Sequence, residues 1–153
     1  MATALPEFPE PQGQGAAGAS AQDQVRVMVV DDSSTIRELI ALNLGLEGYD
    51  VVTAEDGQEC LRLLSEVAMG RAPVPQLLCL DVVMPGLDGV ELTAKLKATP
   101  STADIPILIV SASAQRRDFE LAQGAGADGY LTKPFAPDDL LAEVERLISM
   151  RRT

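Results

Sequence analysis

Five polar side chains follow or end apolar runs that are predicted to be β-strands. They are three aspartates, a serine and a lysine: Asp31, Asp32, Asp81, Ser111 and Lys133. Because the carboxyl ends of parallel strands meet at one edge of a sheet, these side chains are expected to converge. One aspartate at a strand end is commonly a turn or cap residue, but two carboxylates about 5 Å apart repel by about 3 kcal/mol. The cluster therefore predicts a site that binds a cation.

The charges of this cluster indicate which cation would bind. Three carboxylates and the ammonium of Lys133 leave a charge of −2, which one divalent cation neutralises. An oxygen-rich site with few protein ligands suits Mg²⁺, which keeps several waters. The chain has no histidine, which excludes Ser-His-Asp and Cys-His nucleophile pairs and any His-ligated zinc site. We therefore expect Mg²⁺ as the cofactor.

A carboxylate beside a bound cation can attack phosphorus and form an acyl phosphate. Phosphoryl transfer requires mainly that the phosphoryl oxygens be positioned and neutralised. The ammonium of Lys133 and the hydroxyl of Ser111 are suitable donors for those oxygens. Asp81 is the best nucleophile candidate because it ends the predicted central strand, and Asp31 and Asp32 are expected to hold the metal.

Strand and helix patterns alternate along the part of the chain that positions these residues. Short apolar runs predict five strands, at 25–30, 50–54, 77–81, 105–112 and 128–131. Apolar residues at helical spacing predict five helices, at 33–46, 56–67, 89–96, 115–123 and 137–150. Continuous apolar strands indicate a sheet covered on both faces. With right-handed crossovers, this is an α/β fold with a doubly wound, five-stranded parallel sheet, flavodoxin-like (βα)5.

The composition divides the chain into a short tail and one domain. Of the 153 residues, 46% are hydrophobic and 23% are charged, which is ordinary for a globular protein. Residues 1–24 are rich in Ala, Gly, Gln and Pro and contain little that a core could bury. We therefore predict a disordered N-terminal tail at 1–24 and a single domain at 25–150.

The charge balance and the hydropathy limit the expected partners and location. The chain has 23 acidic and 12 basic residues, a net charge of −11, which argues against a nucleic-acid partner. No apolar run reaches the ~18–20 residues that a membrane span needs, so no membrane contact is expected. The N-terminus lacks the basic and apolar segments of a signal peptide, which favours a cytoplasmic protein.

Four segments together resemble the receiver domain of two-component response regulators: MVVDDSSTIRELI, LLCLDVVMPGLDGVEL, ILIVSAS and GADGYLTKPF. The likeness covers residues 25 to about 150, and the motifs follow one another in the family's order. The resemblance implies that Asp81 is the phosphoacceptor and a metal ligand. It implies that Asp32 binds Mg²⁺ directly, that Asp31 acts mostly through water, and that the backbone carbonyl of Val83 is a further ligand.

The resemblance also implies contacts to the phosphoryl group and a conformational switch. Ser111 and Lys133 match the family's phosphate-contacting residues, and Ala112 is small, which leaves the phosphoryl group room. Ser111 and Tyr130 match the switch pair, in which the aromatic ring turns inward on activation. The peptide bond before Pro134 is expected to be cis, as is usual in the family.

The leading hypothesis is a stand-alone response regulator that acts as a phosphorylation switch and not as an enzyme. Because the chain has no histidine, the phosphoryl group is expected from a histidine of a partner, either a histidine kinase or a histidine phosphotransfer protein. Three residues follow the last predicted helix, so output is expected through contact with a target protein that the sequence does not identify.

Three alternatives stay open. A metal-dependent phosphohydrolase of the haloacid dehalogenase type needs an acid two residues after its nucleophile, where this chain has Val83. A nucleotide or flavin binder would place glycines or hydroxyls after the first strand, where this chain has two carboxylates. The third alternative is a receiver-like domain that binds partners without being phosphorylated.

Overall fold

The computed structural model describes residues 24–152, so the predicted tail lies outside the described residues except for Gln24. Five parallel strands form one sheet in the order β3-β2-β4-β5-β6. The strands are β2 (Arg26–Val30), β3 (Asp50–Ala54), β4 (Leu77–Asp81), β5 (Ile107–Ser111) and β6 (Gly129–Thr132). The helices are α1 (Ser34–Leu46), α2 (Gly57–Ala68), α3 (Gly89–Lys97), α4 (Arg116–Ala125) and α5 (Pro137–Arg152).

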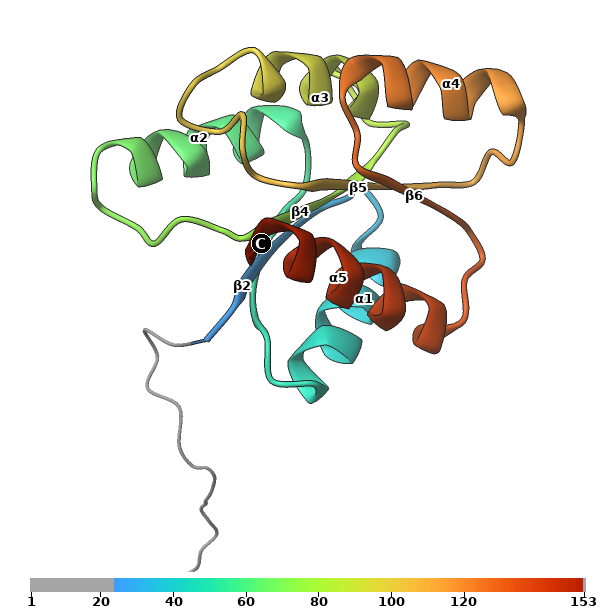
Figure 1. Ribbon diagram of the computed structural model, residues 1–153, viewed down its shortest axis with the longest axis horizontal. Coiled ribbons are helices and arrows are strands. Elements are labelled where there is room, and N and C mark those ends of the chain that lie inside the picture. Colours follow the sequence, from blue (N-terminus) through green and yellow to red (C-terminus); the bar gives the residue numbers. More distant parts are fainter. Residues whose placement is uncertain (1–23, 153) are drawn as a thin grey trace, which may run out of the picture.

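The helices cover both faces of the sheet, which confirms the doubly wound fold (Figure 1). Helices α2, α3 and α4 lie on one face, and α1 and α5 lie on the other. Each layer has its own buried cluster, because alternate side chains of a strand point to opposite faces. The cluster under α2, α3 and α4 includes Cys60, Leu64, Leu92, Leu96 and Ala122. The cluster under α1 and α5 includes Ile40, Leu44, Leu140, Val144 and Leu147.

The strand order reverses direction beside β2. The chain passes from β2 to β3 on one side and then to β4 on the other. In folds of this kind, ligands bind in the crevice outside the carboxyl ends of the strands at this reversal. Asp31 follows β2 and Asp81 is the last residue of β4, so both lie at that crevice.

Helices α3 and α5 start where predicted, and α1, α2 and α4 start one residue later. Ser33 is the N-cap of α1, and its side chain accepts a hydrogen bond from the first turn. Asp56 and Glu59 resemble a capping box in the sequence, and Asp56 is the N-cap of α2, with its side chain accepting from the Glu59 N–H. Asp88 and Glu91 form a reciprocal capping box at the start of α3. These caps satisfy backbone N–H groups that have no partner within the helix. No helix within residues 24–152 combines the length and apolar character that crossing a membrane requires.

The fourth strand in the chain is shorter than predicted. Strand β5 spans Ile107–Ser111 and leaves out Ile105, Pro106 and Ala112 of the predicted run 105–112. Pro106 has no N–H to donate to a neighbouring strand, although its carbonyl accepts from the Leu78 N–H at 3.0 Å. Ile105 and Pro106 are buried although they lie outside the strand. The apolar run in the sequence therefore indicated burial and not the extent of the strand.

Gly89 lets the loop after β4 return closely to that strand. Its N–H donates to the Val82 carbonyl at 2.9 Å. A Cβ atom at this position would overlap the carbonyl oxygen of Asp81 and would lie 2.9 Å from the Cα of Val82. The absence of a side chain at Gly89 therefore helps to fix the backbone of Asp81.

Replacing Gly89 by alanine is expected to lower the free energy of unfolding by about 3 kcal/mol, because the backbone of residues 81 and 82 must move. Gly45→Ala is the matched control: it lies in α1, a Cβ there meets nothing within 4 Å, and a gain of about 0.5–1 kcal/mol is expected. Urea unfolding of both variants measures the difference. A Gly89→Ala protein as stable as wild type would contradict the close approach.

Candidate functional site

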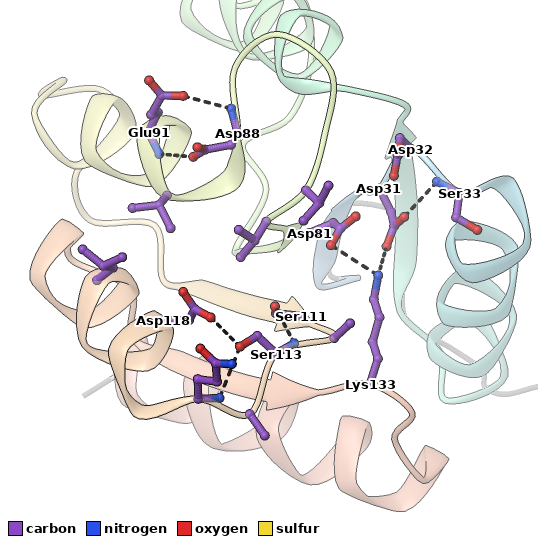
Figure 2. A pocket seen from close by; sticks show the side chains of 17 residues that line it. Asp31, Asp32, Ser33, Asp81, Asp88, Glu91, Ser111, Ser113, Asp118 and Lys133 are labelled. Carbon is purple, nitrogen blue, oxygen red and sulfur yellow. Dashed lines mark hydrogen bonds and ion pairs between the residues drawn. The ribbon is translucent and has the colours of Figure 1, made fainter.

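Three aspartates meet at the carboxyl ends of the two adjacent strands β2 and β4. Asp31, Asp32 and Asp81 each offer one carboxylate oxygen, and these three atoms lie within 4.8 Å of one another. Asp31 and Asp81 are only 1% and 7% exposed, whereas Asp32 is open to solvent. Figure 2 shows the carboxylates of Asp31 and Asp81 turned toward the same point. The predicted cluster is therefore assembled in the folded chain.

Lys133 crosses from the loop after β6 to this cluster. Its Nζ lies 2.9 Å from Oδ2 of Asp31 and 3.3 Å from Oδ1 of Asp81 (Figure 2). The loop that carries it is held by a hydrogen bond from the Lys133 N–H to the Ser111 carbonyl at 2.7 Å. The Lys133–Pro134 peptide bond is cis. The ammonium of Lys133 thus bridges two buried carboxylates. Such pairing offsets the free-energy cost of burying a charge.

Two further contacts hold Asp31 and were not found from the sequence. The Ser33 N–H donates to Oδ1 of Asp31 at 2.9 Å. The guanidinium of Arg37, in α1, donates to the Asp31 carbonyl oxygen at 2.7 Å. The sequence does show an arginine in the helix that follows the two aspartates. It does not show that this arginine contacts Asp31, because the contact is to a backbone carbonyl and no pattern of residue types identifies such a partner.

The pKa values of Asp81 and Lys133 are shifted by burial and by the neighbouring charges. The pKa of Asp81 is raised, first by burial and then by the negative charge of Asp31, while Lys133 opposes the shift. Burial acts to lower the pKa of Lys133, but its hydrogen bond to Asp31 and the charge of Asp81 outweigh burial and raise it. Lys133 therefore stays protonated at neutral pH, and three carboxylates and one ammonium leave a charge of −2. This oxygen donor set fits Mg²⁺.

The remaining predicted residues surround the same space. A pocket of about 870 Å³ is lined by the acidic cluster and Lys133 together with Val83, Ser111 and Ala112. Ser111 ends β5 and is buried, and its Oγ accepts a hydrogen bond from the Ser113 N–H at 3.1 Å. The pocket also reaches the N-terminal ends of α3 and α4. It is large enough to take a phosphoryl group beside Asp81.

Tyr130 does not line this pocket but lies behind the loop that follows β5. Its hydroxyl donates to the Ser113 carbonyl at 2.8 Å. Its ring meets Phe119 of α4 edge-on, with centroids 5.6 Å apart, and packs against the core cluster beneath α4. The structure therefore holds this half-buried ring between Ser113 and Phe119, and connects it to Ser111 through Ser113.

Known proteins share this architecture. The response regulator receiver domain family matches residues 27–145. Response regulator MprA of Mycolicibacterium vanbaalenii is 40% identical over 129 residues, 84% of this chain and 52% of that protein. The DNA-binding dual master transcriptional regulator RpaA of Synechocystis is 38% identical over 128 residues, 84% of this chain and 50% of that protein. The chain belongs to the response regulator receiver domain family, as the sequence motifs predicted.

Solved structures agree with this assignment. The chemotaxis protein CheY4 of Vibrio cholerae superimposes with a TM-score of 0.72 at 31% identity, covering 81% of this chain and 98% of that one. The receiver domain of a Francisella response regulator gives a TM-score of 0.73 at 30% identity, covering 83% and 98%. Two-component signalling is thus the setting of this domain.

The expectation that nucleic acid has no part in the function is wrong. RpaA is named as a DNA-binding regulator, and this chain matches only half of its length. A net charge of −11 is an argument about the surface of this sequence alone. It does not describe contacts that the other half of such a regulator makes, which is why the charge argument failed.

Asp81→Asn is expected to raise the free energy of unfolding at pH 7 by about 1–2 kcal/mol in the absence of Mg²⁺. The substitution removes a repulsion of about 3 kcal/mol per neighbouring carboxylate, and it also loses part of the attraction to Lys133. A carboxyl whose folded pKa is raised loses stability as the pH rises through that pKa. The gain should therefore shrink as the pH falls toward the ordinary aspartate value of about 3.9.

Urea unfolding between pH 4.5 and pH 8 measures this difference. Asp104→Asn is the control, because Asp104 is an exposed acid in the loop between α3 and β5. It should change stability little at either pH. A less stable Asp81→Asn protein at pH 7 would show that Lys133 more than compensates for the repulsion.

Proposed function

We propose that Asp81 accepts a phosphoryl group from a histidine of a partner protein in a Mg²⁺-dependent reaction. The observation that carries the proposal is the bridge from Lys133 to the buried Asp31 and Asp81, in a cluster of three carboxylates and one ammonium with a charge of −2. Such a cluster is costly for folding alone, and it is suited to neutralise a transferring phosphoryl group. Membership of the receiver family supports the same reaction.

In the proposed step, a carboxylate oxygen of Asp81 attacks the phosphorus of a phosphohistidine. The new O–P bond forms as the N–P bond breaks, and the imidazole nitrogen leaves with the electron pair and is protonated from water. The donor must be another molecule, because this sequence contains no histidine. The product is an acyl phosphate on Asp81.

Asp31, Asp32 and Asp81 would hold the metal, with the backbone carbonyl of Val83 as the further proposed ligand. When bound, Mg²⁺ supplies positive charge to the phosphoryl oxygens. Lys133 already lies 3.3 Å from Asp81 and would pair with a phosphoryl oxygen bound there. Asp32 is exposed, and its carboxylate would contribute a ligand from the solvent-facing side of the cluster.

Ser111 and Ala112 occupy the side of the pocket formed by β5. The Ser111 oxygen accepts a hydrogen bond from the Ser113 N–H, which leaves its own hydrogen free to donate to a phosphoryl oxygen. Ala112 has no side-chain atom beyond Cβ, so the phosphoryl group has room beside it. Charge-assisted hydrogen bonds of this kind contribute about 1.5–3 kcal/mol.

The proposed output is a change of the surface made by α4, β6 and α5, driven by Ser111 and Tyr130. A ligand shifts a two-state equilibrium only by its difference in binding free energy between the states. Ser111 supplies part of that difference and Tyr130 transmits it, because Ser113 contacts both. Stand-alone signalling and the absence of enzymatic activity stay predictions, since the chain spans about half the length of its curated relatives.

Incubation with acetyl phosphate and Mg²⁺ is expected to add one phosphoryl group, detected by intact-mass spectrometry. Chelation of Mg²⁺ should abolish the addition, because the pocket then keeps its repulsive charge. Asp81→Asn should not be modified, and the exposed-site control Asp104→Asn should be modified as wild type. A phosphorylated histidine phosphotransfer protein should serve as donor in place of acetyl phosphate.

Two results would overturn this proposal. Modification of Asp81→Asn to the same extent as wild type would place the phosphoryl group elsewhere. An unmodified wild-type protein with every donor would favour a receiver-like domain that binds partners without phosphorylation.

Beryllofluoride, which mimics an acyl phosphate, is expected to shift amide NMR signals from Ala112 through Tyr130 to α5. Ser111→Ala should still bind beryllofluoride but should lose most of the shifts beyond the pocket, because the donor to the bound group is gone. Amide spectra with and without the mimic measure both effects. Wild-type shifts confined to residues that touch Asp81 would instead indicate a passive phosphoryl carrier.

A further inference from the structure

Ser113 is a junction between three elements, because each of its polar groups has a partner. Its backbone N–H donates to Ser111 Oγ at 3.1 Å, and its carbonyl accepts from the Tyr130 hydroxyl at 2.8 Å. Its side-chain hydroxyl donates to Oδ2 of Asp118, in the first turn of α4. The same oxygen accepts from the Gln115 N–H at 3.2 Å. A hydroxyl has one donor and two acceptor sites, so the single donor of this group is used by Asp118.

Helix α4 has no side-chain cap, and Ser113 contacts it instead through the side chain of Asp118 in its first turn. Gln115 occupies the N-cap position of α4 but makes no side-chain cap hydrogen bond. The helices α1, α2 and α3 do have such bonds, from Ser33, Asp56 and Asp88. The start of α4 is therefore tied to the loop two residues before the N-cap, and through that loop to Ser111 and Tyr130.

Asp118 faces the pocket that contains Asp81. Both residues line it, and Figure 2 shows the Asp118 carboxylate meeting the Ser113 hydroxyl at the edge of the pocket. Within residues 24–150, no arginine or lysine forms an ion pair with Asp118. The hydrogen bond from Ser113 is therefore the interaction that fixes its carboxylate.

We propose that Asp118 is a positioning residue, which through Ser113 keeps Ser111, Tyr130 and the first turn of α4 moving as one unit. The proposal rests on the proposed function, since Ser111 must sense the phosphoryl group for the unit to respond. With the hydrogen bond present, a displacement at Ser111 reaches Tyr130 through the backbone of Ser113 and reaches α4 through the side-chain hydroxyl of the same residue. Without it, the loop can adjust to the phosphoryl group while the helix stays in place.

Fluorine NMR of protein labelled with 3-fluorotyrosine tests this coupling. The chain has two tyrosines, and they lie on opposite faces of the sheet: Tyr130 packs under α4, and Tyr49 packs with the cluster under α1 and α5. The Tyr130 signal reports the switch, and the Tyr49 signal reports whether the fold is intact. In wild type, beryllofluoride with Mg²⁺ is expected to move the Tyr130 signal and leave the Tyr49 signal unchanged.

Asp118→Ala and Ser113→Ala are each expected to reduce the beryllofluoride-induced movement of the Tyr130 signal at least twofold. Both variants should still be phosphorylated at Asp81 by acetyl phosphate, because neither residue belongs to the acidic cluster. Asp118→Asn and Ser113→Thr should restore the movement, since an amide oxygen can accept the hydrogen bond and a threonine hydroxyl can donate it. This rescue separates a specific hydrogen bond from general stabilisation of α4.

Glu120→Ala is the matched control, because Glu120 is an exposed acid of α4 that pairs with Arg116. It should leave the Tyr130 response as in wild type. A full response in both alanine variants, a loss in Glu120→Ala equal to that in Asp118→Ala, or no rescue by Asp118→Asn would each overturn the positioning role. A wild-type protein that binds no beryllofluoride and takes no phosphoryl group would instead overturn the proposed function.

Discussion

The ammonium of Lys133 is the interaction on which the site depends. It reaches from the loop after β6, past β5, to carboxylates at the ends of β4 and β2, and one of its two contacts joins residues 102 positions apart in the chain. A buried carboxylate without a partner would be strongly destabilising, so Asp31 and Asp81 can be held close together only while Lys133 lies between them. The position of that loop, fixed by the hydrogen bond to the Ser111 carbonyl, is therefore set together with the acidic cluster.

Lys133 neutralises only part of the negative charge of the three aspartates. The remaining negative charge is what favours a cation at this site. Three carboxylates and one ammonium leave the cluster negative, and the raised pKa of Asp81 expresses the remaining repulsion. Folding tolerates this repulsion because the surrounding sheet and the close approach of Gly89 fix the backbone at Asp81. A cation and a phosphoryl group would relieve it, so the repulsion between the carboxylates favours binding.

The pocket is connected to one of the two helical layers. Ser111 lies at its edge, and Ser113 joins it to Tyr130 and to α4, all on the side of the sheet that carries α2, α3 and α4. The cluster under α1 and α5 contributes Leu131 and Phe135 around the Lys133 loop and is a separate packing unit. A change at Asp81 therefore reaches α4 through hydrogen bonds, whereas its link to α1 passes through Asp31 and Arg37.

The sequence by itself determined the strand and helix order, the doubly wound sheet and the residues of the acidic cluster, because apolar runs and strand-end carboxylates are local patterns. Local patterns also explain the errors: Ser33 was counted in the helix that it caps, and Ile105 and Pro106 in a strand that begins at Ile107. The prediction that no nucleic acid is involved was wrong because it used the net charge of this chain alone. Relatives such as RpaA are about twice as long as the segment that this chain matches. Only the tertiary structure decided that Arg37 holds the Asp31 backbone and that Ser113 joins Ser111, Asp118 and Tyr130. Those contacts use backbone atoms and side-chain rotamers from separate elements, which take their positions only when the sheet and its two helical layers have packed.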